Sequence, residues 1–266
     1  MIDPARIDFS ALDRPEVLHF LFHPRPDWGP PLSDLNTQDI MIPVEGDVAI
    51  GARYHFAAPE APTILFFHGN GEIVSDYDEL GPFYRSMGLN FLPVDYRGYG
   101  RSGGTPTVTH MMRDAHRVFD HLRHWLKENG YWGRVFIMGR SLGSASAAAL
   151  AAAYPDTVGG LIIESGFAET APLLRRLGVD LGNIGVTGRE LLQNRDAMAQ
   201  VTCPTMIIHA ENDHIIPLAD GEALFAACPA ENKRFLCIPH ADHNNLMAVG
   251  FEAYMEAIRD FILSTA

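Results

Sequence analysis

The chain has few cysteines, no long hydrophobic run and no excess of positive charge. Its three cysteines, Cys203, Cys228 and Cys237, are an odd number without the spacing of metal ligands. We therefore expect reduced, mostly buried thiols and a cytoplasmic protein. No apolar run approaches the roughly 20 residues that cross a bilayer. The first ten residues carry acids where a signal peptide needs bases, so we also expect no secretion signal.

Acidic side chains outnumber basic ones, with 33 Asp and Glu against 20 Lys and Arg and a formal net charge of −13. Such a surface repels phosphate backbones and anionic lipids, so nucleic acid is excluded as an expected partner and no membrane span is predicted. Hydrophobic residues make up 47% of the 266 residues, which is typical of a globular protein with a large core.

Residues 1–35 differ from the rest, because they are rich in proline and show no sustained hydrophobic period. We interpret them as an extended N-terminal arm with one short helix, packed on the domain that follows. An apolar cluster, Leu18–Phe22, lies within the arm. An alternative hypothesis has Phe20 and Phe22 covering part of a pocket or forming a subunit contact, so a homo-oligomer stays open.

The remainder of the chain predicts eight strands. They are expected at Asp39–Val44, Val48–Phe56, Thr63–Phe67, Asn90–Val94, Arg134–Met138, Gly160–Ile163, Thr205–His209 and Arg234–Ile238. The first two are separated by a short turn and predict a hairpin. From Thr63 onward strands alternate with helical patterns, which indicates an α/β fold with a doubly wound, mainly parallel sheet and helices on both faces. No linker or repeat interrupts residues 36–266, so we expect a single domain, with a short cap at about residues 165–202.

The most informative motif is Gly139-Arg140-Ser141-Leu142-Gly143, which reads Gly-x-Ser-x-Gly. A short apolar, β-branched run precedes it, and the small helix formers of residues 144–153 follow it. A strand, a glycine-flanked serine and a helix together predict a nucleophile elbow, in which Ser141 projects from a sharp, strained turn. Side chains at the two glycine positions would collide in such a turn.

A serine nucleophile needs a base within hydrogen-bond reach, and the base needs an orienting acid. The acid candidate is Asp213, which follows a predicted strand; Glu211 and Glu164 are its rivals. The base candidate is His243, after the last strand and just before the C-terminal helix, with His240 as the alternative. The carboxyl ends of parallel strands face one crevice, so we expect these groups to meet at one edge of the sheet.

The stretch Phe66–Gly71 leaves a buried strand and enters a glycine-rich turn. Backbone N–H groups in such a turn converge on one point and can stabilise a negative oxygen. We expect one donor to be the amide of Leu142, at a helix N-terminus. The other is expected to be the amide of Asn70, with Gly71 as the alternative.

With these residues assembled, the chain resembles the serine hydrolases of the α/β-hydrolase fold. The order Ser141, Asp213, His243 is typical of that family, and the stretch Val94–Gly103 also matches it. The resemblance extends from about Gln38 to the C-terminus and is closest to short-capped carboxylesterases, thioesterases and serine peptidases. It implies that Ser141 attacks an acyl carbonyl through an acyl-enzyme intermediate, without metal or organic cofactor.

The resemblance does not fix the substrate. A short apolar cap favours a small-molecule, short-acyl ester, and Gly71, Glu72, Phe167 and Ile215 are the expected substrate contacts. Glu72 either touches substrate or only favours the next helix N-terminus. The apolar cap residues, Phe167, Leu173, Leu174, Leu177, Val179 and Leu181, either line the pocket or pack against the sheet. A thioesterase, a serine peptidase and a non-catalytic binding protein of the same fold stay as alternatives.

Overall fold

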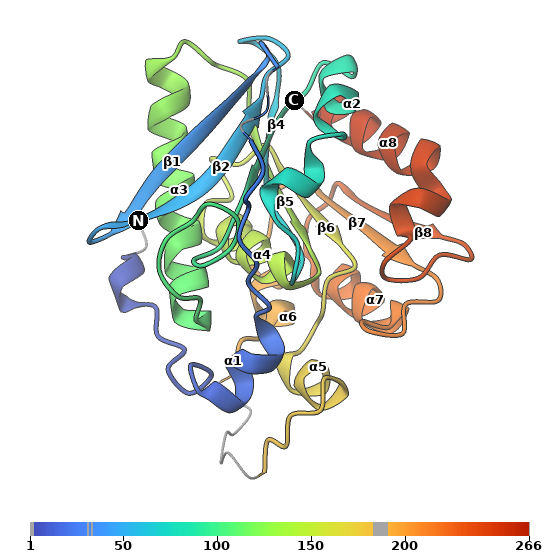
Figure 1. The fold of residues 1–266 in the computed structure, drawn as a ribbon. Helices are drawn as coiled ribbons and strands as arrows, with labels where there is room; N and C mark the ends of the chain where they lie inside the picture. Colours follow the sequence, from blue (N-terminus) through green and yellow to red (C-terminus); the bar gives the residue numbers. More distant parts are fainter. Residues whose placement is uncertain (1–2, 31, 33, 183–190, 266) are drawn as a thin grey trace.

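The computed structural model describes residues 3–30, 32, 34–182 and 191–265. Within them, eight strands form one sheet in the order β1-β2-β4-β3-β5-β6-β7-β8 (Figure 1). The strands are β1 (Thr37–Glu45), β2 (Val48–His55), β3 (Thr63–Phe67), β4 (Asn90–Val94), β5 (Val135–Arg140), β6 (Gly160–Glu164), β7 (Thr205–Ala210) and β8 (Lys233–Ile238). The β1–β2 hairpin and the β2–β4 pair are antiparallel, and the other pairs are parallel. The predicted fold class is confirmed.

The central strands are buried on both faces, as their continuous apolar sequences predict. In β3, Ile64 and Phe66 belong to one hydrophobic cluster, and Leu65 and Phe67 belong to the other. This alternation follows from the two-residue period of a strand, which sends successive side chains to opposite faces. The sheet therefore needs a helical layer on each side.

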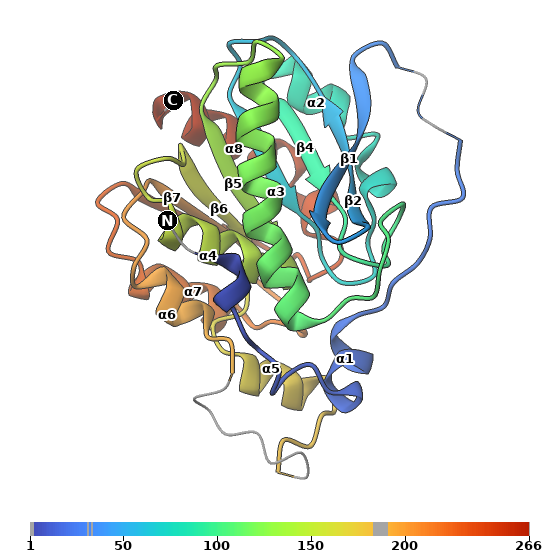
Figure 2. The ribbon, with the colours of Figure 1, turned by 90° about the vertical axis from the view of Figure 1, so that its left-hand side faces the viewer.

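The helices supply these two layers (Figure 2). One face packs against α3 (Val108–Glu128), α4 (Ser144–Ala153), α6 (Asn194–Met198) and α7 (Leu218–Ala227). The other face packs against α2 (Gly81–Ser86) and α8 (Leu246–Thr265). In the described part of the chain, every helix is too short or too polar to traverse a bilayer. All three cysteines are unpaired, and Cys203 and Cys228 are buried.

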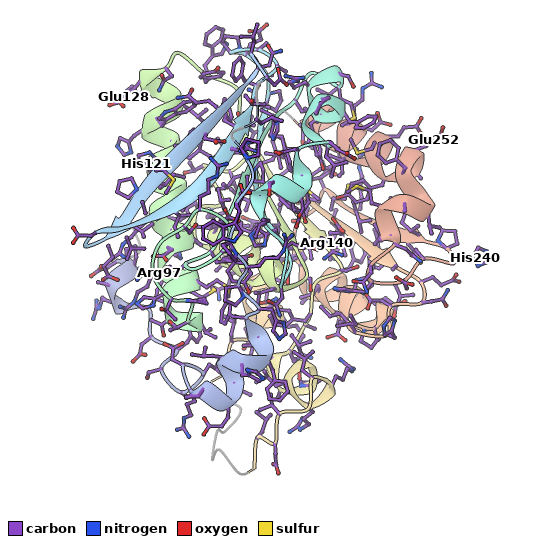
Figure 3. All side chains as sticks on the ribbon, in the orientation of Figure 1. Arg97, His121, Glu128, Arg140, His240 and Glu252 are labelled. Atoms are coloured by element: carbon purple, nitrogen blue, oxygen red, sulfur yellow. The ribbon has the colours of Figure 1, made fainter. Side chains whose placement is uncertain are left out.

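The loop after β4 is held by buried charges beside α3 and the end of β1 (Figure 3). Arg97 makes a two-pronged ion pair with Asp114 of α3, at 2.7 and 2.9 Å, and also reaches Glu45 at 3.2 Å. Asp95 accepts a hydrogen bond from the Val74 amide, in the short helix η2 (Val74–Tyr77), at 3.0 Å. These contacts give the loop a structural role.

The N-terminal arm and the cap region meet at one end of the molecule (Figure 1). The arm contains η1 (Pro4–Arg6) and α1 (Pro15–Leu21), and α1 contacts α5 (Thr170–Arg176) of the cap region. Leu12 and Val17 are fully buried, so the arm contributes to the core. Residues 1, 2, 31 and 33 of the arm and 183–190 of the cap region lie outside the described residues.

Candidate active site

Ser141 occupies the strained turn that the sequence predicts. It begins η3 (Ser141–Gly143), between β5 and α4, with φ of +50°, a left-handed conformation that few non-glycine residues adopt. A Cβ atom at Gly139 would lie 2.3 Å from the Gly143 carbonyl oxygen, and one at Gly143 would lie 2.1 Å from the Phe67 carbonyl oxygen. Both glycines are therefore required by close backbone contacts, and the turn is locked between β3 and α4.

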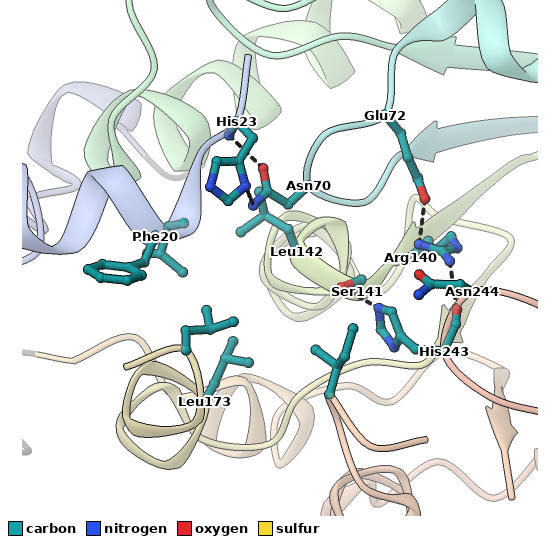
Figure 4. A pocket seen from close by; sticks show the side chains of 13 residues that line it. Phe20, His23, Asn70, Glu72, Arg140, Ser141, Leu142, Leu173, His243 and Asn244 are labelled. Carbon is teal, nitrogen blue, oxygen red and sulfur yellow. Dashed lines mark hydrogen bonds and ion pairs between the residues drawn. The ribbon is translucent and has the colours of Figure 1, made fainter. Parts of the chain in front are cut away.

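The serine is the first member of a hydrogen-bonded chain of three side chains, of which Figure 4 shows Ser141 and His243. The Oγ of Ser141 lies 3.1 Å from Nε2 of His243, and Nδ1 of His243 lies 2.6 Å from Oδ2 of Asp213. The carboxylate oxygen can only accept, so Nδ1 donates to it and Nε2 is left to accept the proton of the serine hydroxyl. The structure thus brings the predicted nucleophile, base and acid together.

Asp213 is held by the backbone that follows it. Its Oδ1 accepts the amides of Ile215 and Ile216 at 3.0 and 2.7 Å, and His209 binds the carbonyl oxygen of Ile216 at 2.8 Å. Burial disfavours the charge on Asp213, but the hydrogen bond and charge of His243, the Ile216 amide and the charge of His209 together outweigh burial, so the pKa of Asp213 lies below its ordinary value. The acid therefore stays ionised and keeps the imidazole of His243 in one orientation.

The rival residues have other partners. The side chain of His240 is 90% exposed at the edge of the molecule, and its amide donates to Glu211 (Figure 3). Glu164 is buried at the end of β6, where it accepts the hydroxyl of Tyr254 at 2.6 Å. The histidine and the carboxylate that the structure joins to Ser141 by hydrogen bonds are thus His243 and Asp213.

The glycine-rich turn after β3 borders the same pocket as Ser141. The Asn70 side chain fixes this turn, because its Oδ1 accepts the His23 amide at 2.8 Å and the Tyr99 hydroxyl at 2.7 Å. Its Nδ2 donates to Nδ1 of His23 at 2.9 Å. Both Asn70 and Leu142, the expected backbone donors, line the pocket (Figure 4). Gly71 does not line it, because its carbonyl group turns to Arg25 of the arm, at 2.8 Å.

The pocket has a volume of about 190 Å³ and is mostly apolar away from the reacting groups. Phe20 and Leu21 of α1 form one wall, and Leu173 and Leu177, in and just after α5, form the opposite wall. Ile215, an expected substrate contact, also lines it. The hypothesis that Phe20 and Phe22 cover part of a pocket is thus correct for Phe20, which lines the pocket, and wrong for Phe22, which is buried in the core.

Two expected substrate contacts need correction or refinement. Phe167 does not line the pocket, because it is buried in the core behind Leu142 and Leu173. Leu174, Val179 and Leu181 are also core residues. Glu72 does line the pocket, but its carboxylate accepts the Gly69 amide at 2.7 Å and the Tyr77 hydroxyl at 2.5 Å. Its contacts within the protein therefore explain its position.

Sequence reasoning missed Arg140, His23 and Asn244, which also line the pocket. The position of Arg140, directly after a buried apolar run and directly before Ser141, could have predicted its role, because a charged side chain there needs a partner of opposite charge. His23 gave no such signal, because only the folded arm brings it to Asn70. Among the described residues, no group of three His, Cys, Asp or Glu side chains is arranged to hold a metal ion.

Known proteins resemble this chain in sequence. Residues 58–184 match the family described as serine aminopeptidase, S33, a range that includes Ser141 and excludes Asp213 and His243. Protein bem46 of Schizosaccharomyces pombe is 28% identical, over 77% of this chain and 69% of its own length. The alpha/beta hydrolase domain-containing protein WAV2 of Arabidopsis thaliana is also 28% identical, over 85% of this chain and 78% of its own length.

Solved structures resemble it in fold. The esterase Pf2001 of Pyrococcus furiosus superposes with a TM-score of 0.71 at 16% identity, over 86% of this chain and 92% of its own. Est1E of Butyrivibrio proteoclasticus, solved with ferulic acid bound, gives a TM-score of 0.67 at 21% identity, over 85% of this chain and 98% of its own. The chain therefore has the α/β-hydrolase fold, as its sequence predicted.

Proposed function

We propose that this protein is an esterase that cleaves short-acyl carboxylic esters through Ser141, His243 and Asp213. The observation that carries the proposal is the continuous hydrogen-bonded chain from Asp213 through His243 to Ser141, which ends in a pocket. A serine hydroxyl becomes a useful nucleophile only when an oriented base removes its proton, and this geometry supplies such a base.

In the proposed reaction, Oγ of Ser141 attacks the ester carbonyl carbon while Nε2 of His243 takes the hydroxyl proton. The amides of Leu142 and Asn70 stabilise the negative oxygen of the tetrahedral intermediate. The C–O bond then breaks, and the proton on His243 passes to the leaving alcohol. Water, activated by His243, attacks the acyl-enzyme and releases the carboxylic acid and free Ser141. Asp213 stabilises the imidazolium in both halves.

The size and lining of the pocket support a short acyl group. A volume of about 190 Å³ is below the usual range for drug-sized ligands, and aliphatic and aromatic side chains form two of its walls. A butyryl group fits such a space, whereas a palmitoyl chain would have to extend beyond it. The similarity in fold to esterases supports ester chemistry. The short acyl length is supported by the volume and lining of the pocket alone.

The experiment that tests the proposal uses a fluorophosphonate probe and an ester panel. We expect wild-type protein to react with the probe and Ser141→Ala to be inert, with hydrolysis of p-nitrophenyl acetate and butyrate lost in parallel. A well-folded wild-type protein that does not react would favour a non-catalytic binding role.

The same panel separates the substrate classes. Acyl-CoA thioesters and aminoacyl anilides, measured beside the oxygen esters, test the thioesterase and peptidase alternatives. We expect the highest kcat/KM for acetyl or butyryl oxygen esters. A preference for palmitoyl esters would contradict the short-acyl part of the proposal and leave the nucleophile assignment intact.

A further inference from the structure

Arg140, the residue before Ser141, connects three parts of the site, and Figure 4 shows its contacts with Glu72 and His243. Its Nη1 lies 2.6 Å from Oε1 of Glu72, and its Nε lies 3.0 Å from Oε1 of Glu164. Its Nη2 donates to the backbone carbonyl oxygen of His243 at 2.8 Å. One guanidinium thus links the turn after β3, the end of β6 and the residue that carries the base.

The partners of Arg140 are themselves fixed. The second oxygen of Glu72 accepts the Gly69 amide and the Tyr77 hydroxyl, and the second oxygen of Glu164 accepts the Tyr254 hydroxyl. Burial opposes the charge on Arg140, but the two carboxylates outweigh it and raise the pKa of the guanidinium above its ordinary value. The cation is therefore permanent.

These contacts leave Arg140 poorly suited to binding substrate. Its side chain is only 12% exposed, and each of its three nitrogens already faces an oxygen of the protein. A planar guanidinium with fixed donors instead suits the holding of several acceptors in one plane. The hydrogen bond to the His243 carbonyl oxygen holds the backbone of the residue that carries the imidazole. An arginine that only stabilised the core would not need this contact.

We propose that Arg140 is a positioning residue, which sets the imidazole of His243 against Ser141 and against the oxyanion turn. The inference rests on the proposed function. Arg140 orients the turn that carries Asn70 through its ion pair with Glu72, and it orients the imidazole through its hydrogen bond to the His243 carbonyl. Both effects act on the reacting geometry, so the loss of Arg140 should lower kcat more than it raises KM. Displacing a reacting group by about 1 Å costs on the order of 100-fold in rate.

The test compares Arg140→Lys with Arg97→Lys. Both arginines pair with two carboxylates and are little exposed, at 12% for the Arg140 side chain and 7% for that of Arg97, but Arg97 pairs with Asp114 and Glu45 in the structural loop after β4. A lysine keeps the charge and loses the planar fork. We expect Arg140→Lys to lower kcat for p-nitrophenyl butyrate by about 10- to 100-fold with KM within about threefold. Arg97→Lys should keep kcat within about twofold.

Chemical rescue gives a readout that loss of stability would not produce. Arg140 lines the pocket of Ser141 and also a neighbouring cavity, so Arg140→Ala leaves a space that a small cation can reach from outside. We expect guanidinium, at concentrations far below those that denature proteins, to restore part of the lost kcat in Arg140→Ala. The same addition should not stimulate wild-type protein or Arg97→Lys.

The outcomes separate this inference from the proposed function. If wild-type protein reacts with the fluorophosphonate and folded Arg140 variants keep kcat within threefold, the positioning role is wrong and the esterase proposal stands. If wild-type protein is inert, both are wrong. If the Arg140 variants do not fold, Glu164→Gln and Glu72→Gln weaken the same contacts with little change of shape. A lowered kcat in either then supports the inference, and an unchanged kcat in both contradicts it.

Discussion

At the scale of single residues, the role proposed for Asp213 depends on its hydrogen bond to His243. Asp213→Asn keeps the shape but replaces an acceptor by a group that also donates, so the imidazole no longer presents its unprotonated Nε2 to Ser141. We expect kcat on p-nitrophenyl butyrate to fall by roughly 10³- to 10⁴-fold. The matched control is Glu211→Gln, in the same loop and half-exposed, which should stay near wild type. Equal losses in both variants would contradict the assignment of the acid.

Phe20 is the residue whose loss should change acyl-chain preference. Its ring forms part of the pocket wall contributed by the arm, so Phe20→Ala lengthens the space available to an acyl chain. We expect the ratio of kcat/KM for octanoyl over butyryl esters to rise several-fold. Phe83→Ala, on α2, where the Phe83 ring contacts Phe251, should leave the ratio unchanged. An unchanged ratio in Phe20→Ala would show that the acyl chain does not reach this wall.

At the scale of elements, the tight junction of β3, β5 and α4 determines the geometry of the nucleophile turn. A methyl group at Gly143 would meet the Phe67 carbonyl at 2.1 Å, and backbone cannot move as easily as a side chain. We expect Gly143→Ala to lower the free energy of unfolding by about 1–3 kcal/mol and to lower kcat strongly. Gly103→Ala, where a Cβ would meet no atom within 4 Å, is the control in urea unfolding and kinetics. Comparable stability of the two variants would contradict the argument.

The elements and the three central side chains were predictable because each has a local signal. Apolar runs such as Ile64–Phe67 define buried strands, and Ser141, Asp213 and His243 each follow one. Side-chain direction in the short cap was not predictable, since Leu173 faces the pocket and Phe167 faces the core within a few residues. Long-range polar partners were not predictable either. The partners of Arg140 lie about 24 to 103 positions away, and hydrophobic periodicity does not report such contacts.

At the scale of the whole molecule, two buried histidines make stability depend on pH. Burial lowers the pKa of His55 and of His116 to about 4, well below the ordinary value. Between about pH 6.5 and pH 4 the unfolded chain binds protons that the folded chain does not, so the free energy of unfolding falls as the pH falls. Each histidine should contribute about 2 kcal/mol of this loss between pH 7 and pH 5.

Urea unfolding at both pH values measures this contribution. Neither ring nitrogen of His55 has a hydrogen-bond partner among the described residues, so His55→Leu removes no hydrogen bond there. His116→Gln keeps a polar group near the Tyr154 hydroxyl. Each variant should lose about 2 kcal/mol less than wild type on acidification, whatever its stability at neutral pH. His240→Gln, at an exposed position, should follow the wild-type curve. Parallel curves for all three variants would contradict the buried, neutral state of these histidines.

The pocket takes its walls from residue 20 near one end of the sequence and from residue 244 near the other. During synthesis, a nascent chain therefore cannot complete this pocket until the loop that carries Asn244 has left the ribosome. A protease that removes the segment with Phe20 or the segment with Asn244 should abolish the proposed ester hydrolysis, even if the central sheet stays folded. If the proposed function holds, turnover of a chromogenic ester would thus report that the chain is intact from Phe20 to Asn244.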